Sequence, residues 1–240
     1  MNGLKETMEY VVRLSDANIH QVNGSTYSDK NIYRIDEALR ADPLGMSTLF
    51  GLLDYIKGEI DHIMASKMIV HIVSPVEVRL LSCLDGDRKR ENLVIAKADI
   101  PAFPFGKFIG SEEFLIHIRS KFIQNEDAGK LLRFAGTTEA GTVAGYADDG
   151  ISQSATVRKG IASKETELVP NPVKLRPYRT FTEVEQPESE FIFRMKNFDD
   201  DPGCALFEAD GGAWKRAAMM NIKNHLEYEL TEYPQFTVVS

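Results

Sequence analysis

The chain has 240 residues, and a hydrophobic fraction of 43% is enough to bury a core without disulfides or a structural metal. Lys and Arg number 28 against 36 Asp and Glu, and the resulting net charge of −8 disfavours non-specific binding to nucleic acid. The chain begins without the apolar segment of a signal peptide, and no stretch approaches the ~18 apolar residues of a membrane-spanning helix, so we expect a cytoplasmic protein that does not bind membranes.

The first third of the chain is predicted to contain two helices separated by turns. Residues 4 to 15 carry apolar side chains at helical spacing, which predicts an amphipathic helix that needs a surface to dock on. Residues 18 to 32 are rich in Asn, Gly, Ser and Asp, which is typical of turns. Asp42 to Gly45 indicates another break between secondary-structure elements. Ser47 is expected to cap the second helix. Its predicted apolar face consists of Leu49, Phe50, Leu53, Ile56 and Ile60.

A hairpin and two further helices are predicted next. The runs Met68 to Val73 and Val76 to Leu84 are β-rich, and Leu93 to Ala96 follows a charged turn, which predicts antiparallel pairing. Ser111 with two glutamates after it begins a helix. The buried stripe of that helix is predicted to contain Phe114, Leu115, Ile118, Phe122 and Ile123, and a second short helix Leu131, Leu132 and Phe134.

The rest of the chain is predicted to be rich in strands. Glycines at 136, 141, 145 and 150 indicate a flexible connection over residues 135 to 150. A helix over Ala213 to Leu230 is expected to bury Trp214, Ile222 and Leu226. The predicted strands are Ile151 to Val157, Val173 to Leu175, Phe191 to Met195, Ala205 to Phe207 and Phe236 to Val239.

These elements together predict one α+β domain over residues 1–240. We expect a largely antiparallel sheet or sandwich with flanking helices and a helical N-terminal segment. Residues 1–46 form an N-terminal helical or loop arm in this interpretation, and residues 47–240 form the α+β core.

Motifs for catalysis or metal binding are incomplete. Glu59 to His62 is a single Glu-x-x-His, and a di-iron bundle needs two. Asp199 to Asp201 lie in a Pro-Gly turn without EF-hand spacing, and Asp210 before Gly211-Gly212 is expected to cap a helix rather than leave an anion site. Nucleotide-binding loops and nucleophile elbows are missing. We therefore predict no cofactor and no metal site, and the sequence identifies no catalytic residue.

The two cysteines, Cys83 and Cys204, are far apart in an otherwise ordinary composition. Disulfide scaffolds are instead small and cysteine-dense. Both are predicted to be free thiols in a reducing compartment.

Two segments remain candidates for binding. The first is a basic and aromatic cluster suited to single-stranded nucleic acid, although Glu183, Glu185 and Glu188 follow it and favour local ion pairs. The second is an aromatic loop that either covers the core or docks a partner. The cluster consists of Lys174, Arg176, Tyr178 and Arg179, and the loop carries Phe103, Phe105 and Phe108.

A combination of short motifs in the downstream half resembles a known family. The motifs are Asp148 to Gln153, Pro170 to Val173, Pro177 to Phe181, Gln186-Pro187 and Phe207 to Trp214. Together they resemble the YfdQ-like family of bacteriophage and prophage proteins, over about Ser47 to Leu230. That family has no assigned activity, so the resemblance implies no catalytic residue. It implies a phage gene product made in the cytoplasm of a bacterial host.

We expect a self-associating interaction or assembly protein rather than an enzyme, because amphipathic termini and an aromatic loop accompany missing catalytic signatures. The expected partner is a second copy of the chain, with a ring or shell as one arrangement. Residues 4 to 15 and Phe236 to Val239 are the segments expected to mediate it. Two alternatives stay open. One is a single-stranded nucleic-acid-binding accessory of phage recombination, and the other is a metal-dependent hydrolase or nuclease using dispersed carboxylates.

Overall fold

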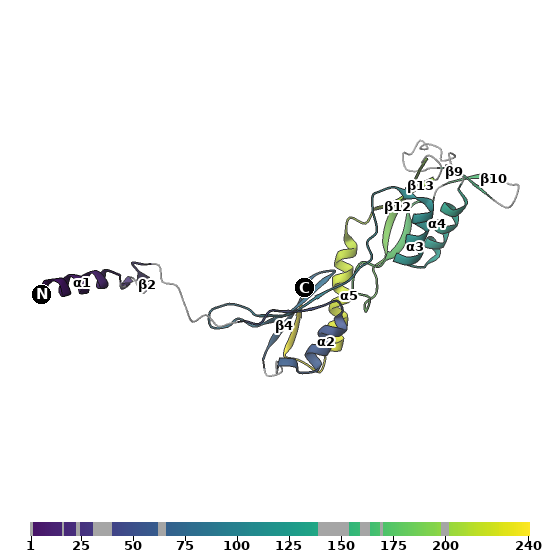
Figure 1. The fold of residues 1–240 in the computed structure, drawn as a ribbon. Coiled ribbons are helices and arrows are strands. Elements are labelled where there is room, and N and C mark those ends of the chain that lie inside the picture. Colours follow the sequence, from purple (N-terminus) through teal and green to yellow (C-terminus); the bar gives the residue numbers. More distant parts are fainter. Residues whose placement is uncertain are drawn as a thin grey trace. The chain divides into compact units, whose positions relative to one another are not determined.

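The structure is a computed structural model, and it describes residues 2–15, 17–22, 25–30, 40–61, 66–138, 154–158, 164–168, 170–197 and 202–240. The chain divides into two compact units, Met1–Arg40 and Ala41–Ser240 (Figure 1). The described residues form helices and mostly antiparallel sheets, so the predicted α+β fold is confirmed. Within the described ranges, no helix combines the length and the apolar character that crossing a membrane requires.

The N-terminal unit consists of one helix and one hairpin. Helix α1 covers Asn2–Ser15, as predicted. Strands β1, Ile19–Val22, and β2, Ser25–Ser28, pair in antiparallel fashion within the segment whose composition is typical of turns. Asn18 stabilises the open end of the hairpin, because its backbone N–H and its side-chain amide each donate to the carboxylate of Asp29 at 2.8 Å.

The first large sheet of the second unit has five strands in the order β14-β4-β5-β6-β3. Strands β4, β5 and β6 are antiparallel, which confirms the predicted hairpin, whereas the outer strands β14 and β3 run parallel to their neighbours. Strand β3 overlaps Asp42 to Gly45, where the sequence indicated a break between secondary-structure elements. The strands are β3 Leu44–Met46, β4 Met68–Ser74, β5 Glu77–Ser82, β6 Asn92–Lys97 and β14 Phe236–Val239.

Helix α2, Leu49–Lys57, packs on this sheet. Its N-cap is Thr48 rather than the predicted Ser47, since the Thr48 hydroxyl accepts a hydrogen bond from the backbone N–H of Gly51 at 3.0 Å. The prediction for Phe50 is also wrong, because the helix buries the stripe of Leu49, Leu52, Leu53 and Ile56 and leaves Phe50 60% exposed. Ile60 follows the end of the helix and is likewise exposed.

Helix α5, Ala213–Glu229, also contributes to the core on this sheet (Figure 1). Ile222 and Leu226 are fully buried there, as predicted. Trp214 is only half-buried, which corrects the prediction that it belongs to the core.

The second large sheet has the order β7-β13-β12-β11-β8 and is antiparallel throughout. Helices α3, Ser111–Lys121, and α4, Glu126–Thr137, contribute to its separate core, in which the rings of Phe114 and Phe193 stack at 5.3 Å. The strands are β7 Ile109–Gly110, β8 Phe122–Ile123, β11 Val173–Pro177, β12 Ser189–Asn197 and β13 Pro202–Glu208. A two-stranded hairpin joins β9, Ser154–Arg158, to β10, Lys164–Leu168.

Several sequence predictions lie outside the described residues. These include most of the glycine-rich connection, since α4 already occupies its first residues through Thr137 and the description stops after Thr138. The others are His62 of the Glu-x-x-His motif, the first residues of the predicted strand at Ile151, and Asp199 to Asp201.

Both cysteines are free thiols, as predicted, but their environments differ. Cys83 is exposed, whereas Cys204 is fully buried on β13. We expect a thiol reagent to modify Cys83 rapidly in the native protein and Cys204 only after denaturation, because buried thiols are shielded from reagents. Mass spectrometry during the reaction measures both rates, with the Cys83→Ser variant as control. Rapid labelling of that variant in the native state would contradict the burial of Cys204.

Candidate interaction surfaces

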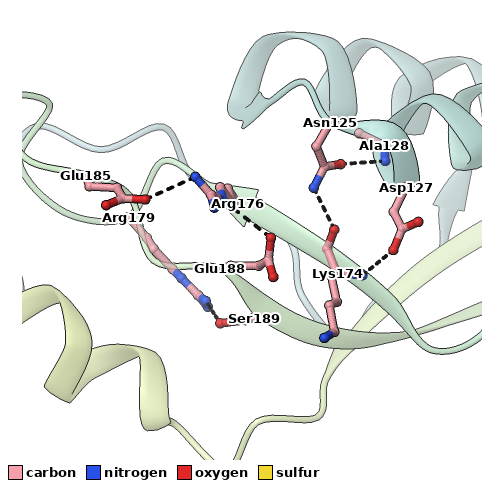
Figure 2. A network of polar contacts seen from close by, with 9 residues as sticks. All are labelled: Asn125, Asp127, Ala128, Lys174, Arg176, Arg179, Glu185, Glu188 and Ser189. Carbon is pink, nitrogen blue, oxygen red and sulfur yellow. Dashed lines mark hydrogen bonds and ion pairs between the residues drawn. The ribbon is translucent and has the colours of Figure 1, made fainter.

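The basic cluster begins on β11, where strand alternation buries Val173 and Leu175 and exposes Lys174. Lys174 Nζ lies 3.8 Å from Glu190 Oε1. Arg176 Nη1 lies 3.1 Å from Glu185 Oε1, and Arg176 Nε lies 3.5 Å from Glu188 Oε2 (Figure 2). Nearby glutamates thus neutralise the two cations locally. Exposed pairs of this kind contribute at most ~1 kcal/mol to stability.

The backbone of Lys174 also joins β11 to helix α4. Its N–H donates to the Asp127 carboxylate at 2.9 Å, and its carbonyl accepts from the Asn125 side-chain amide at 2.8 Å (Figure 2). Asn125 at the same time caps α4, because its side-chain oxygen accepts from the N–H of Ala128. The hydrogen bond from Lys174, followed by one from Lys130, lowers the pKa of Asp127. This end of the cluster has a structural role.

Arg179 is buried, with its side chain only 8% exposed. Its guanidinium donates to Glu208 at 2.7 Å and to the Ser189 hydroxyl, and its carbon atom Cζ lies 4.1 Å from the centre of the Trp214 ring. Trp214 therefore covers the guanidinium, which explains its place outside the core. Burial lowers the pKa of Arg179 to about 10, against the opposing effect of Glu208 and Asp210, so the group stays charged at pH 7.

Asp210 is the second charged group of this network, at 4.0 Å from Arg179. Burial acts to raise its pKa, but the Ser189 hydroxyl and the amides of Gly212 and Trp214 donate to the carboxylate and bring the pKa below its ordinary value. The N-cap of α5 is Gly212, which makes no side-chain cap hydrogen bond, so the prediction that Asp210 caps this helix is wrong. The Asp210 carboxylate nevertheless accepts hydrogen bonds from two backbone amides where the helix begins. Arg179 and Asp210 together fix the start of α5 to β12.

The segment after Arg179 contributes to the core on the first sheet. Phe181 and Val184 are buried in that core, and the Thr180 hydroxyl donates to the carbonyl of Pro75 at 2.5 Å. Glu183 accepts hydrogen bonds from the N–H groups of Leu49 and Phe50 at the start of α2. The segment predicted as a nucleic-acid contact is thus partly occupied in connecting the two cores. Tyr178, the remaining candidate, is half-buried, and its backbone N–H donates to Lys121.

The aromatic loop packs largely on its own unit. The ring centres of Phe103 and Phe105 lie 4.6 Å apart, and both side chains are half-buried against the core on the second sheet. The Phe105 ring stacks on that of Phe191, with 5.4 Å between the ring centres. Phe108 lies 6.2 Å from Phe207, and the Lys196 ammonium lies 4.6 Å above the Phe108 ring. All three side chains are half-buried, so none of them presents a fully exposed ring to a partner.

Helices α3 and α4 border a groove that the sequence did not predict. The groove measures about 560 Å³, and Ile116 at its border is 58% exposed. Ile116 lies outside the predicted buried stripe of α3, and an apolar residue at such a position could have indicated an exposed apolar surface. The lining residues are Leu115, Ile116, Arg119, Ser120 and Leu132.

Acidic residues in a second hollow, of about 590 Å³, are engaged by protein groups. Asp61 accepts a hydrogen bond from the Tyr55 hydroxyl at 2.9 Å, and Glu91 accepts one from the N–H of Ala41 at 3.2 Å. Burial and the bond to Asp61 raise the pKa of Tyr55 to about 12. In the part of the chain that the structure describes, no three His, Cys, Asp or Glu residues are arranged to hold a metal.

The apolar stripe of α1 is the most exposed apolar surface of the N-terminal unit. Leu4, Met8 and Val11 are 75%, 66% and 58% exposed, and Ile19 and Tyr27 of the hairpin are also exposed. Among the residues of this unit whose burial is described, none is buried. The unit therefore presents apolar side chains without a described core beneath them.

No protein-family model, curated protein or solved structure matches the chain. The stripe on α1 and the groove beside α3 are thus defined only by the residues of this chain.

Proposed function

We propose that the chain is a self-associating interaction or assembly protein, and that α1 supplies one of its contacts. The observation that carries this proposal is the exposed apolar stripe of Leu4, Met8 and Val11. A bacteriophage origin is part of the proposal and rests only on the sequence resemblance.

The physical argument begins with the stability of the N-terminal unit. A helix of 14 residues is marginal in water by itself, because isolated helices shorter than ~12 to 15 residues gain too little to offset nucleation. A two-stranded hairpin is marginal for a similar reason. Full burial of one Leu, Met or Val side chain contributes roughly 1.5 to 3 kcal/mol. Covering the stripe with a partner therefore supplies the stabilisation that the unit lacks among its described residues.

The spacing of the stripe suits a partner that is itself a helix. Leu4, Met8 and Val11 are separated by four and three residues, which places them on one narrow face. Stripes with this spacing pack against other helices by inserting side chains between those of the partner.

The C-terminal segment is a weaker candidate for self-association. Strand β14 pairs with β4 of its own sheet, and Phe236 is buried in the core there. This segment already has a partner within its own chain, so the proposal assigns the contact to the N-terminal helix.

We expect the full-length protein to be oligomeric at micromolar concentration and the variant Leu4→Ser/Met8→Ser/Val11→Ser to be monomeric, because serine removes the apolar contact area. Multi-angle light scattering over a concentration series measures both masses. The matched control is Glu6→Ser/Glu9→Ser/Tyr10→Ser, which places three serines on the opposite face of α1. A monomeric full-length protein, or equal masses for the two triple variants, would refute the role of the stripe.

A further inference from the structure

We infer that α1 of one copy lies in the groove between α3 and α4 of a second copy. This inference rests on the proposed function and adds the acceptor surface to it. The stripe and the groove are both exposed apolar surfaces, and one chain carries both. Two copies therefore hold everything that the contact requires.

The groove has the chemistry of a helix-binding surface. Leu115, Ile116 and Leu132 supply apolar side chains, and Arg119 is the charged residue among the described lining. The Ser120 hydroxyl donates to the carbonyl of Ile116 at 2.7 Å, so its proton is already used within α3. An apolar helix face can thus cover the groove without burying an unsatisfied serine hydroxyl.

The dimensions of donor and acceptor agree. Helix α1 has 14 residues, and helices α3 and α4 have 11 and 12. At ~1.5 Å per residue these helices are roughly 16 to 21 Å long. The stripe from Leu4 to Val11 covers eight residues, as does the face of α3 from Glu112 to Arg119. Two helical turns of α1 therefore match two turns of the groove.

Charge selects a parallel orientation of α1 along α3. Glu112 precedes Ile116 by four residues and so lies on the same face of α3, with Arg119 one turn beyond Ile116. Lys5 flanks the stripe near the start of α1, and the carbonyl groups at the end of α1 carry partial negative charge. Parallel packing brings Lys5 to Glu112 and the end of α1 to Arg119. Antiparallel packing brings Lys5 to Arg119 instead.

The choice of a second copy as the partner follows from the proposed self-association. Leu4 of the N-terminal unit is 75% exposed, and Ile116 of the second unit is 58% exposed. Contacts of α1 of one copy with the groove of the next copy build either a closed ring or an open chain of subunits.

The test introduces Ile116→Asp into the full-length protein and measures its mass by light scattering over a concentration series. We expect association to weaken at least tenfold, because a carboxylate then occupies the apolar groove. Ile116 is exposed, so thermal unfolding should match that of the parent protein. The matched control is Met220→Asp, an exposed apolar residue of another helix, which should leave the mass unchanged.

Mixing experiments separate this inference from the proposed function. A variant with the α1 stripe replaced by serine keeps its groove, and the Ile116→Asp variant keeps its stripe, so an equimolar mixture should form a heterodimer that neither variant forms alone. If Ile116→Asp associates normally and only the stripe variant loses association, the groove is not the acceptor surface. Self-association then occurs through α1 alone, by pairing of two α1 helices. Normal association of both variants would refute the proposed function itself.

A charge exchange tests the orientation. Lys5→Glu and Glu112→Lys should each weaken association roughly two- to fivefold, the range expected of one exposed ion pair. The combined variant should recover the parent affinity. Additive weakening in the combined variant would overturn the parallel arrangement.

Discussion

Replacement of Arg179 by methionine should lower the free energy of unfolding by about 3 kcal/mol, since breaking a buried ion pair by removing one partner is strongly destabilising. The group left behind is Asp210, whose side chain is only 12% exposed. Methionine fills much of the volume of the arginine stem, so the loss reports mainly on the ion pair, the hydrogen bonds and the stacking on Trp214. Urea denaturation followed by the fluorescence of Trp214, the single tryptophan of the chain, measures the change.

Arg176 provides the matched control three residues earlier in the same segment. Its partners Glu185 and Glu188 have side chains that are 70% and 41% exposed, so Arg176→Met should cost less than ~1 kcal/mol. Equal losses for the two variants would show that burial of Arg179 adds nothing to stability. A second check is the variant Arg179→Met/Asp210→Asn, which should be more stable than the sum of the single changes, because it removes both charges.

The elements that the sequence predicted well are those with a long periodic pattern. Helices α3 and α5 and the hairpin of β5 and β6 repeat their apolar residues over several turns or pleats. The buried positions of β12 also alternate, from Ser189 through Met195. A pattern of this length survives small errors at its ends, since each further repeat adds independent evidence for the same face.

The elements that the sequence missed are short or depend on distant partners. Strands β7 and β8 have two residues each, which is too few to show alternation. Strand β3 pairs Leu44 with Val94, fifty residues away. The strand Phe236–Val239 was predicted, but its pairing with β4, which places Phe236 beside Met68, was not. Parallel pairing of this kind is determined by the packing of the whole unit and leaves no local signal.

The candidate surfaces show the same division between local and distant information. Glu185 and Glu188 follow Arg176 closely, and the expected local pairs are present. The burial of Arg179 depends instead on Glu208, Asp210 and Trp214, which lie about thirty residues further along the chain. A basic cluster in sequence therefore separates in space into two exposed cations and one buried arginine.

Leu226→Ala should lower the free energy of unfolding by ~2 to 5 kcal/mol, the range for a fully buried leucine whose removal leaves a cavity. Leu226 has no exposed surface and belongs to the core formed by α2, α5 and the first large sheet. It lies one turn after Ile222 on the buried face of α5 and one turn before Leu230, which is also buried. The change therefore removes the middle residue of a continuous contact.

Met220→Ala is the control on the same helix, because Met220 is 48% exposed and alanine keeps the helix intact. Its expected cost is within about 0.5 kcal/mol. Denaturant unfolding of both variants should show a lower midpoint for Leu226→Ala and an unchanged slope, since the surface exposed on unfolding stays nearly the same. If both variants lose the same small amount, the register of α5 on its core is wrong. If Leu226→Ala also changes the slope, the two cores of the second unit unfold separately, and the Arg179 network does not couple them.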